Sequence, residues 1–302
     1  MRALRFKLAL VVSYILFGAS FSVYVSLLHD GVSPEQLFAM QLVFSLSIFT
    51  PLALMQRSFF RLSLNDFGSI FIVALLVIFG WWYLLIEGAS YTNPIDASTI
   101  AVIGPILTLW TSIIAHSRRP TKGEMFGFVL ALLGVMAIIA DRGISLVGSG
   151  REGYGNALVF CAVVAISINT VLITPVLRRR GTVVVMGWYY LVGTLLAMPL
   201  IVDCLPKVNM SELAHLHKAE VGYILVFGSA LPMYLLYKSS EHLTAIHNAL
   251  YHYIQPIIAA LFAILRGQAK IDRTNIIGAV LIFVGMLCVV LSTPRNEVAI
   301  RE

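Results

Sequence analysis

Residues 83–140 read YLLIEGASYTNPIDASTIAVIGPILTLWTSIIAHSRRPTKGEMFGFVLALLGVMAIIA, and residues 234–291 read YLLYKSSEHLTAIHNALYHYIQPIIAALFAILRGQAKIDRTNIIGAVLIFVGMLCVVL. Position 83 matches position 234, and the spacing of 151 holds throughout without a gap. The matched pairs include Pro105 with Pro256, Gly127 with Gly278 and Gly134 with Gly285. An internal repeat must be recognised before any local pattern is interpreted. In an apolar chain it predicts a transporter fold built from two related halves.

The composition is that of a membrane protein. Apolar residues make up 59% of the 302 residues and charged residues 12%, and the mean hydropathy is +0.89. A soluble domain has about 25% charged residues, so this chain cannot cover itself with a polar surface. We therefore predict an all-α integral membrane protein. The three cysteines, Cys161, Cys204 and Cys288, have no metal-binding spacing and are expected to be packed thiols.

The net charge of +6 predicts orientation in the membrane rather than binding to nucleic acid. The basic residues stand in short runs between apolar segments. With the N-terminus inside, fourteen Lys and Arg fall on the cytoplasmic side and seven outside. Cytoplasmic loops carry the excess of positive charge. We therefore expect a multi-pass protein of the inner (plasma) membrane with both termini in the cytoplasm.

Ten segments are long and apolar enough to cross a bilayer, which requires about 20 residues. They cover residues 7–28, 34–56, 66–88, 94–116, 122–140, 153–177, 183–204, 218–238, 244–265 and 273–292. Two five-helix halves follow, residues 1–149 and 150–302. Because five is odd, the second half enters from the opposite side of the membrane, and the repeats are inverted.

Two pairs of segments carry a family resemblance. DASTIAVIGPILT followed by GFVLALLGV, and HNALYHYIQPIIAALFAIL followed by GAVLIFVGM, are two copies of one unit. This unit resembles the repeat of the drug/metabolite transporter superfamily, EamA-type family. The resemblance implies a carrier, in most members an exporter of small metabolites, with a central cavity lined by both repeats. The family's Gly-Glu pairs are replaced here by His116-Ser117 and Gly267-Gln268, so the role of that glutamate does not carry over.

Pro105 and Pro256 stand at matched positions inside the fourth and ninth segments. A proline inside a helix removes one hydrogen bond and crowds the carbonyl four residues earlier, here that of Ala101 or His252. In a membrane such breaks occur where neighbouring groups or a wet cavity satisfy the backbone. We predict hinges or cavity walls, with static kinks as the alternative.

Asp96 and His247 are also matched, and inversion puts them near opposite membrane faces. An ionisable group within a membrane segment is a functional hypothesis by default. We predict gates or proton-linked sites at Asp96, at His247 and at Glu87. Capped or solvated helix ends are the alternative for the matched pair, and plain surface is the alternative for Glu87.

The ninth segment is the most polar, and Tyr251, His252 and Gln255 fall on adjacent faces of its helix. They are predicted to line the substrate cavity, with hydrogen bonds between helices as the alternative. A histidine exchanges protons near neutral pH, so His252 is a candidate for coupling transport to protons.

Aromatic and polar residues of four other segments complete the predicted cavity: Tyr14, Trp81, Tyr83, Asn169 and Tyr234. Rings there can stack on a flat substrate or bind a cationic one. The alternative for the rings of the third and eighth segments is an aromatic belt at the membrane surface.

These patterns predict a secondary transporter of a small organic metabolite, amino-acid-like or related, that exports its substrate by alternating access. The expected partners are the substrate, the lipid bilayer and coupling protons, for a monomer or a dimer, with no cofactor. The chain has no GxxxxGK[ST] nucleotide motif, HExxH zinc pair or GxSxG elbow. The alternatives are a non-transporting membrane partner or receptor and an intramembrane enzyme.

Overall fold

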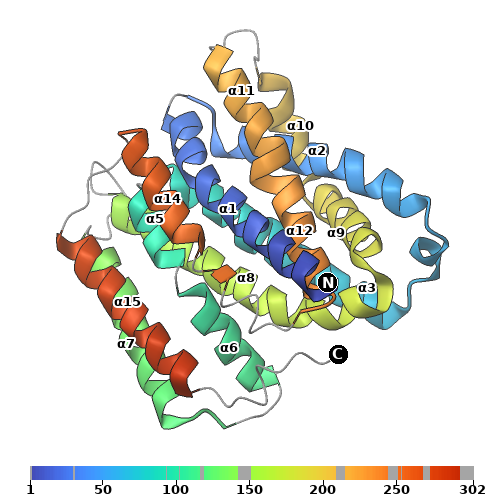
Figure 1. The fold of residues 1–302 in the computed structure, drawn as a ribbon. Coiled ribbons are helices and arrows are strands. Elements are labelled where there is room, and N and C mark those ends of the chain that lie inside the picture. The colour runs from blue at the N-terminus through green and yellow to red at the C-terminus, as the bar shows by residue number, and fades with distance from the viewer. Residues whose placement is uncertain are drawn as a thin grey trace.

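The computed structural model describes residues 2–29, 31–92, 94–101, 103–115, 119–141, 151–208, 215–243, 251–252, 254–267 and 273–292, and within them all regular elements are helices (Figure 1). The first half contains α1 (Arg2–His29), α2 (Pro34–Leu54), η1 (Arg57–Arg61), α3 (Leu64–Ala74), η2 (Leu75–Tyr83), α4 (Leu84–Ala89), α5 (Pro94–Ala101), α6 (Gly104–Ala115) and α7 (Lys122–Asp141). The second contains α8 (Glu152–Arg180), α9 (Thr182–Leu196), α10 (Met198–Cys204), η3 (Leu205–Lys207), α11 (His215–Tyr223), η4 (Ile224–Ala230), α12 (Leu231–Ser240), α14 (Ile254–Leu265) and α15 (Arg273–Ser292). The predicted all-α class is confirmed.

Fewer helices qualify as membrane spans than the sequence predicts. Within the described ranges, five are long and apolar enough: Leu4–His29, Pro34–Leu54, Leu64–Ala89, Glu152–Arg180 and His217–Ser240. The pair Thr182–Leu196 and Met198–Lys207, bent by 68°, makes a sixth if it is one span. The expected count of exactly ten spans is therefore not established by these helices.

Local sequence explains how α2 begins. The Ser33 hydroxyl accepts a hydrogen bond from the Gln36 backbone N–H at 3.2 Å, and the Gln36 side chain accepts one from the Ser33 N–H at 3.2 Å. This reciprocal capping satisfies two backbone donors that the first helical turn leaves open.

Both halves contain a π-helical stretch in the corresponding helix. The stretches are η2 and η4, and the spacing of 151 carries residues 75–79 onto residues 226–230. A π-helical turn is rare and often marks a functional site. Here η2 carries Trp81, and α12, which follows η4, carries Met233, both of which line the cavity described below.

The helices α7 and α15 pack side by side along their length (Figure 1). Gly127 meets the backbone of Gly285, and Gly134 meets the backbone of Gly278. In the repeat, however, Gly127 matches Gly278 and Gly134 matches Gly285. Each glycine thus meets the counterpart of the other, as across a two-fold axis. This antiparallel, self-complementary contact supports the predicted inversion of the two halves.

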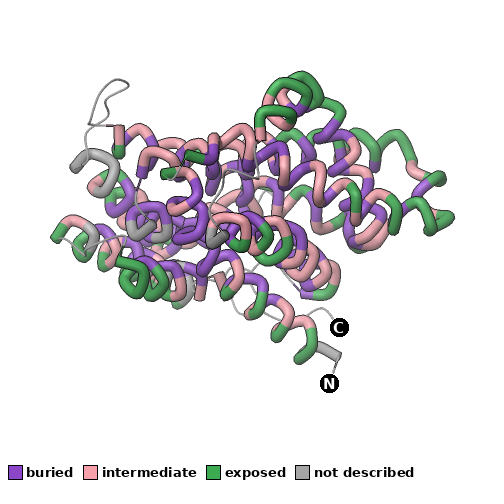
Figure 2. Tube along the Cα trace, turned by 90° about the horizontal axis from the view of Figure 1, so that it is seen from above, coloured by how far each residue is buried: buried purple, intermediate pink, exposed green. Residues whose placement is uncertain are grey.

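The most extensive of the other helix contacts also join the two halves. In the described part of the chain, α1 packs on α12 and α14, α8 packs on α4 and α6, and α2 packs on α9. The core of the protein therefore lies between the repeats rather than within each of them. In Figure 2 the buried residues lie mainly inside the bundle, and the exposed residues lie at its periphery.

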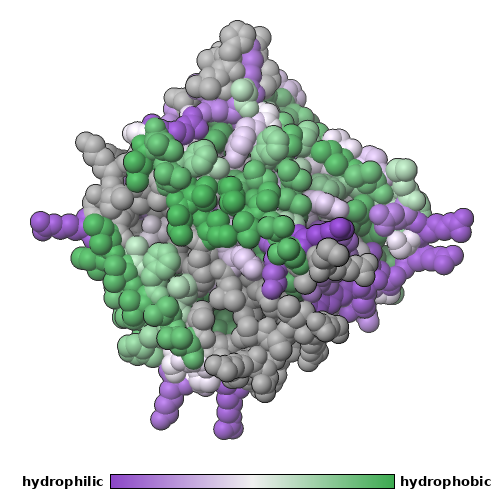
Figure 3. All heavy atoms as spheres, in the orientation of Figure 1, coloured by the Kyte–Doolittle hydropathy of each residue, from purple (hydrophilic) through white to green (hydrophobic). Residues whose placement is uncertain are grey.

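Exposed apolar side chains cover the outer faces of α7 and α15. They include Phe126, Val129, Leu133, Ile277, Val280 and Leu287. Figure 3 shows hydrophobic residues spread over the visible face and hydrophilic side chains at its margins. A soluble protein rarely exposes such a large apolar surface, whereas a bilayer covers it.

Candidate functional site

A cavity of about 40 Å³ lies where helices of both halves meet. Its walls are formed by Tyr14, Phe17, Trp81, Thr108, Ile166, Ser167, Thr170, Met233, Leu236, His252 and Gln255. One buried water needs about 10–15 Å³, so the cavity has room for roughly three waters. In this conformation the site is too small for a metabolite, which can enter only when the helices separate.

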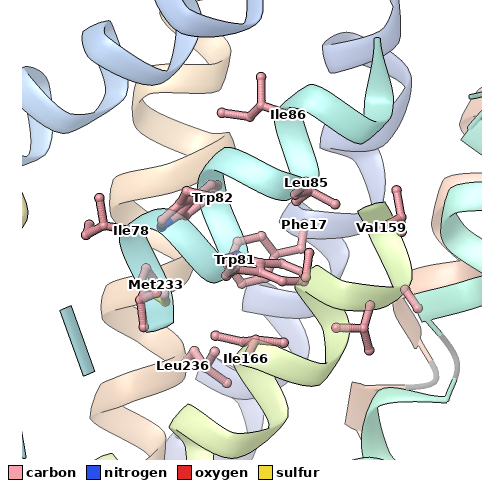
Figure 4. Packing of buried hydrophobic residues seen from close by; sticks show 14 of the residues in the cluster. Phe17, Ile78, Trp81, Trp82, Leu85, Ile86, Val159, Ile166, Met233 and Leu236 are labelled. Carbon is pink, nitrogen blue, oxygen red and sulfur yellow. The ribbon is translucent and has the colours of Figure 1, made fainter. Parts of the chain in front are cut away.

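The indole rings of the third segment lie in the core. Trp81 and Trp82 are each 4% exposed, and Figure 4 shows Trp81 beside Phe17, with Ile166 and Leu236 across the cavity. Rings of an aromatic belt lie at the membrane surface. The belt interpretation is therefore wrong for these two residues, and Trp81 is a cavity wall.

His252 lies flat against Tyr14. Their ring centroids are 4.8 Å apart and the ring planes differ by 22°. Gln255 follows on the same helix surface and is 2% exposed. Four residues predicted for the cavity, Tyr14, Trp81, His252 and Gln255, are thus brought together from three separate segments of the chain.

Gly104 allows this close packing. A Cβ atom at Gly104 would lie 2.7 Å from Cε1 of His252, which is shorter than a van der Waals contact. The Ser167 hydroxyl donates to the Gly104 carbonyl at 3.1 Å and to the Val163 carbonyl at 2.7 Å. The shared proton of this hydroxyl connects α8 to the first turn of α6.

The predicted break at Pro105 is present. The helix α5 ends at Ala101, and α6 begins at Gly104 with Pro105 as its second residue. Because proline cannot donate a backbone hydrogen bond, the first turn of a helix tolerates it well. Pro256 is the third residue of α14, whose described part begins at Ile254.

Asp96 is buried at the start of α5. Its Oδ2 accepts a hydrogen bond from Asn156 Nδ2 at 3.1 Å, and Asn156 in turn pairs with the Thr92 hydroxyl. This links α5 of the first half to α8 of the second. Its predicted partner in the repeat, His247, lies outside the described residues.

Glu87 lies near the same end of the bundle but away from the cavity. It is half-buried, with Tyr91 nearby. The Arg151 guanidinium stacks 4.0 Å above the centroid of the Tyr91 ring and 6.0 Å from that of Tyr154. The carboxylate thus belongs to a region rich in aromatic rings where the two halves join.

The remaining predicted cavity residues do not line this space in the described conformation. Tyr83 packs edge-on to Phe38 at 5.5 Å, and Tyr234 stacks on Phe49 at 6.1 Å. Tyr251 is partly buried against the core. Asn169 is buried, and its Nδ2 donates to the Tyr237 hydroxyl at 3.0 Å.

Sequence reasoning missed Thr108, Ser167 and Thr170 at the cavity. Thr170 donates to the Ile166 carbonyl of its own helix at 2.8 Å. Hydroxyl residues do this in many helices, so their sequence positions gave no distinguishing signal. Met233 and Leu236 match Trp82 and Leu85 of the other repeat, which are not among the lining residues, so the repeat gave no signal for them either.

Ion pairs join the two halves at one end of the bundle, which we call the Asp66 end. The buried carboxylate of Asp66 on α3 binds Arg179 and Arg180 of α8, each at 2.7 Å. Nearby, the Thr182 backbone N–H donates to Glu241 at 3.1 Å. These contacts connect the start of α3 to the ends of α8 and α12 and to the start of α9.

A second ion pair marks the opposite end, which we call the Glu220 end. Glu220 of α11 binds Arg266, which follows α14, and also accepts a hydrogen bond from Ser26 of α1 at 3.4 Å. The other end of α1 is fixed near the Asp66 end, where the Phe6 carbonyl accepts from Ser239 at 3.0 Å. Twenty residues of α1 separate Phe6 from Ser26, about 30 Å of helix.

The described residues contain no group of three or more His, Cys, Asp or Glu that could hold a metal ion. Cys161, Cys204 and Cys288 are free thiols. Cys161 is exposed and the other two are partly buried, so the expectation of packed thiols is wrong for Cys161.

Comparison with known proteins identifies relatives. A family model described as the EamA-like transporter family matches residues 5–140 and 153–291. The chain is similar to two proteins of Bacillus subtilis (strain 168), uncharacterized transporter YyaM (20% identical over 219 residues, 72% of each chain) and uncharacterized transporter YetK (20% over 245 residues, 81% of this chain and 72% of YetK). It is 22% identical to Protein PecM of Dickeya dadantii (strain 3937) over 215 residues, 70% of this chain and 69% of PecM.

One solved structure, titled "Crystal structure of protein", has the same fold. It superposes with a TM-score of 0.62 over 95% of this chain and 97% of its own, at 17% identity.

Proposed function

We propose a secondary carrier mechanism for this chain, which belongs to the EamA-like transporter family and, like its relatives, is a multi-pass membrane transporter. The cargo in this proposal is a small organic metabolite, exported by alternating access. The two moving units are residues 1–149 and residues 150–302, arranged as inverted repeats. The protein acts in the inner (plasma) membrane with both termini in the cytoplasm, as its excess of cytoplasmic Lys and Arg favours.

The observation that carries this proposal is the central cavity between the halves. It is lined by α1, η2 and α6 from one half and by α8, α12 and α14 from the other. The ion pairs at the Asp66 end and the Glu220 end lie on either side along α1. A carrier of this design opens one end at a time. The small cavity volume fits a state in which both ends are closed.

Transport itself is tested with purified protein in liposomes. We expect exchange of a labelled metabolite across the bilayer, and we expect the direction of net flux to reverse when the gradient is reversed. ATP should have no effect, because the chain lacks a nucleotide-binding motif. A folded protein that moves nothing from a broad metabolite panel under any gradient would instead favour a non-transporting membrane partner.

Proton coupling through His252 is a separate proposal. His252 lies at the cavity against Tyr14, and an imidazole ring can take up and release a proton. If it carries the coupling proton, transport should depend on the pH gradient across the membrane, and His252→Ala should abolish that dependence. The control is His242→Ala, because His242 packs on Phe6 at the Asp66 end. An unchanged pH profile in His252→Ala excludes this residue as the proton carrier.

A further inference from the structure

The residues that line the cavity restrict the charge of its cargo. Among the described lining residues none is Asp, Glu, Lys or Arg. A charged group that leaves water for an apolar site is strongly disfavoured unless it meets an opposite charge. The ion pairs of the protein lie instead at the two ends of the bundle. The cavity is therefore suited to an uncharged molecule.

The shape of the walls favours a flat molecule. Tyr14 and His252 stack on each other at the cavity, and Trp81 and Phe17 add two more aromatic rings to its lining. Aromatic rings bind flat conjugated molecules by offset stacking or by edge-to-face contact.

Two buried donors lie at this cavity without a hydrogen-bond partner among the described residues: Trp81 Nε1 and Gln255 Nε2. Their side chains are almost fully buried, with Trp81 4% and Gln255 2% exposed. Buried donors are rarely left unpaired in native proteins. One donor comes from each half of the protein, so both repeats would contribute to the binding of one carbonyl group.

We infer that the cavity binds an uncharged, planar compound whose carbonyl oxygen accepts a hydrogen bond from Trp81, Gln255 or both. This inference rests on the proposed carrier function and narrows its substrate class. Amides, lactams and related conjugated carbonyl compounds have this chemistry. An amino-acid zwitterion also has carboxylate oxygens that accept hydrogen bonds, but its two charges have no partner among the described lining residues.

The test uses four probes with the same ring and different charge: benzamide (neutral), benzoate (anionic), benzylammonium (cationic) and phenylalanine (zwitterionic). Binding to the purified protein is measured by calorimetry and by thermal shift, since a ligand of the native state raises its melting temperature. We expect benzamide to bind at least about tenfold more tightly than each charged probe. A preference for any charged probe, or no benzamide binding at millimolar concentration, overturns the inference.

Variants test the two donors. Gln255→Leu and Trp81→Phe should each weaken benzamide binding by about tenfold. The control is Trp188→Phe, which removes an indole that donates to the Phe59 carbonyl at 3.1 Å, away from the cavity. Unchanged benzamide affinity in both cavity variants would show that these two donors do not bind the carbonyl oxygen of the ligand, and this result would overturn the inference.

Counterflow in liposomes separates this inference from the function on which it rests. If the folded protein exchanges phenylalanine or another charged metabolite but does not bind benzamide, the substrate class is wrong and the carrier function stands. If it exchanges no member of a broad panel, the carrier function itself fails, and the substrate class fails with it.

Discussion

Replacing Asp66 by asparagine is expected to open the cavity from the Asp66 end alone. The Asp66 carboxylate is 5% exposed and accepts hydrogen bonds from two arginines of the opposite half, Arg179 and Arg180. A hydrogen bond to a charged group contributes about 1.5–3 kcal/mol, and partial exposure of both arginines reduces this. A net loss of about 1–2 kcal/mol shifts the balance between closed and open states by roughly 5–30-fold.

Accessibility from each side of the membrane measures this shift. Thr170, a cavity residue, is replaced by cysteine in a chain that lacks Cys161, Cys204 and Cys288. An impermeant maleimide is then applied to sealed vesicles of either orientation. Asp66→Asn should speed labelling about tenfold from the Asp66 side and leave labelling from the other side unchanged or slower.

Glu220→Gln should give the opposite result, because Glu220 holds Arg266 and Ser26 together at the other end. The control is Asp203→Asn, which breaks an exposed pair with Lys207 and should alter neither rate. Equal acceleration from both sides by either variant would mean that these ion pairs stabilise the fold and do not gate the cavity.

Gly285→Ala is expected to destabilise the protein strongly. The new Cβ would lie 2.4 Å from the Gly127 carbonyl oxygen and 2.8 Å from the Ala131 backbone nitrogen. Backbone atoms cannot turn aside as a side chain does, so α7 and α15 must move apart. Membrane helices associate through such close packing of small residues, and overpacking typically costs about 1–3 kcal/mol.

The matched control is Gly222→Ala, in α11, where an added Cβ has nothing within 4 Å. Alanine favours a helix over glycine by about 1 kcal/mol, so this variant should melt at the same temperature or higher. Both are measured in detergent by fluorescence-detected thermal unfolding. A Gly285→Ala protein as stable as the parent would contradict the close approach of these two helices.

The candidate site was partly predictable from the sequence. Tyr14, Trp81, His252 and Gln255 stood out because polar and aromatic side chains are conspicuous in apolar segments, and the structure brings all four to one cavity. The cavity hydroxyls, such as Ser167, could not be predicted, since they also satisfy carbonyls of their own helices.

The ion pairs at the two ends of the bundle could not be predicted either. In the sequence, Arg179 and Arg180 indicate only positive charge that orients the chain in the membrane. Their pairing with Asp66 spans more than a hundred residues and depends on how α3 meets α8.

By itself the sequence determined the helical class, the duplication and the helix break at Pro105, because hydropathy, repeat spacing and proline act locally or by simple comparison. Only the tertiary structure decided which matched residues meet. Gly127 contacts Gly285 and not its own counterpart Gly278. A two-fold rotation between antiparallel helices places each of these glycines against the counterpart of the other glycine of its own helix. The cavity has the same origin, since its walls come from helices that become neighbours only when the two halves pack together.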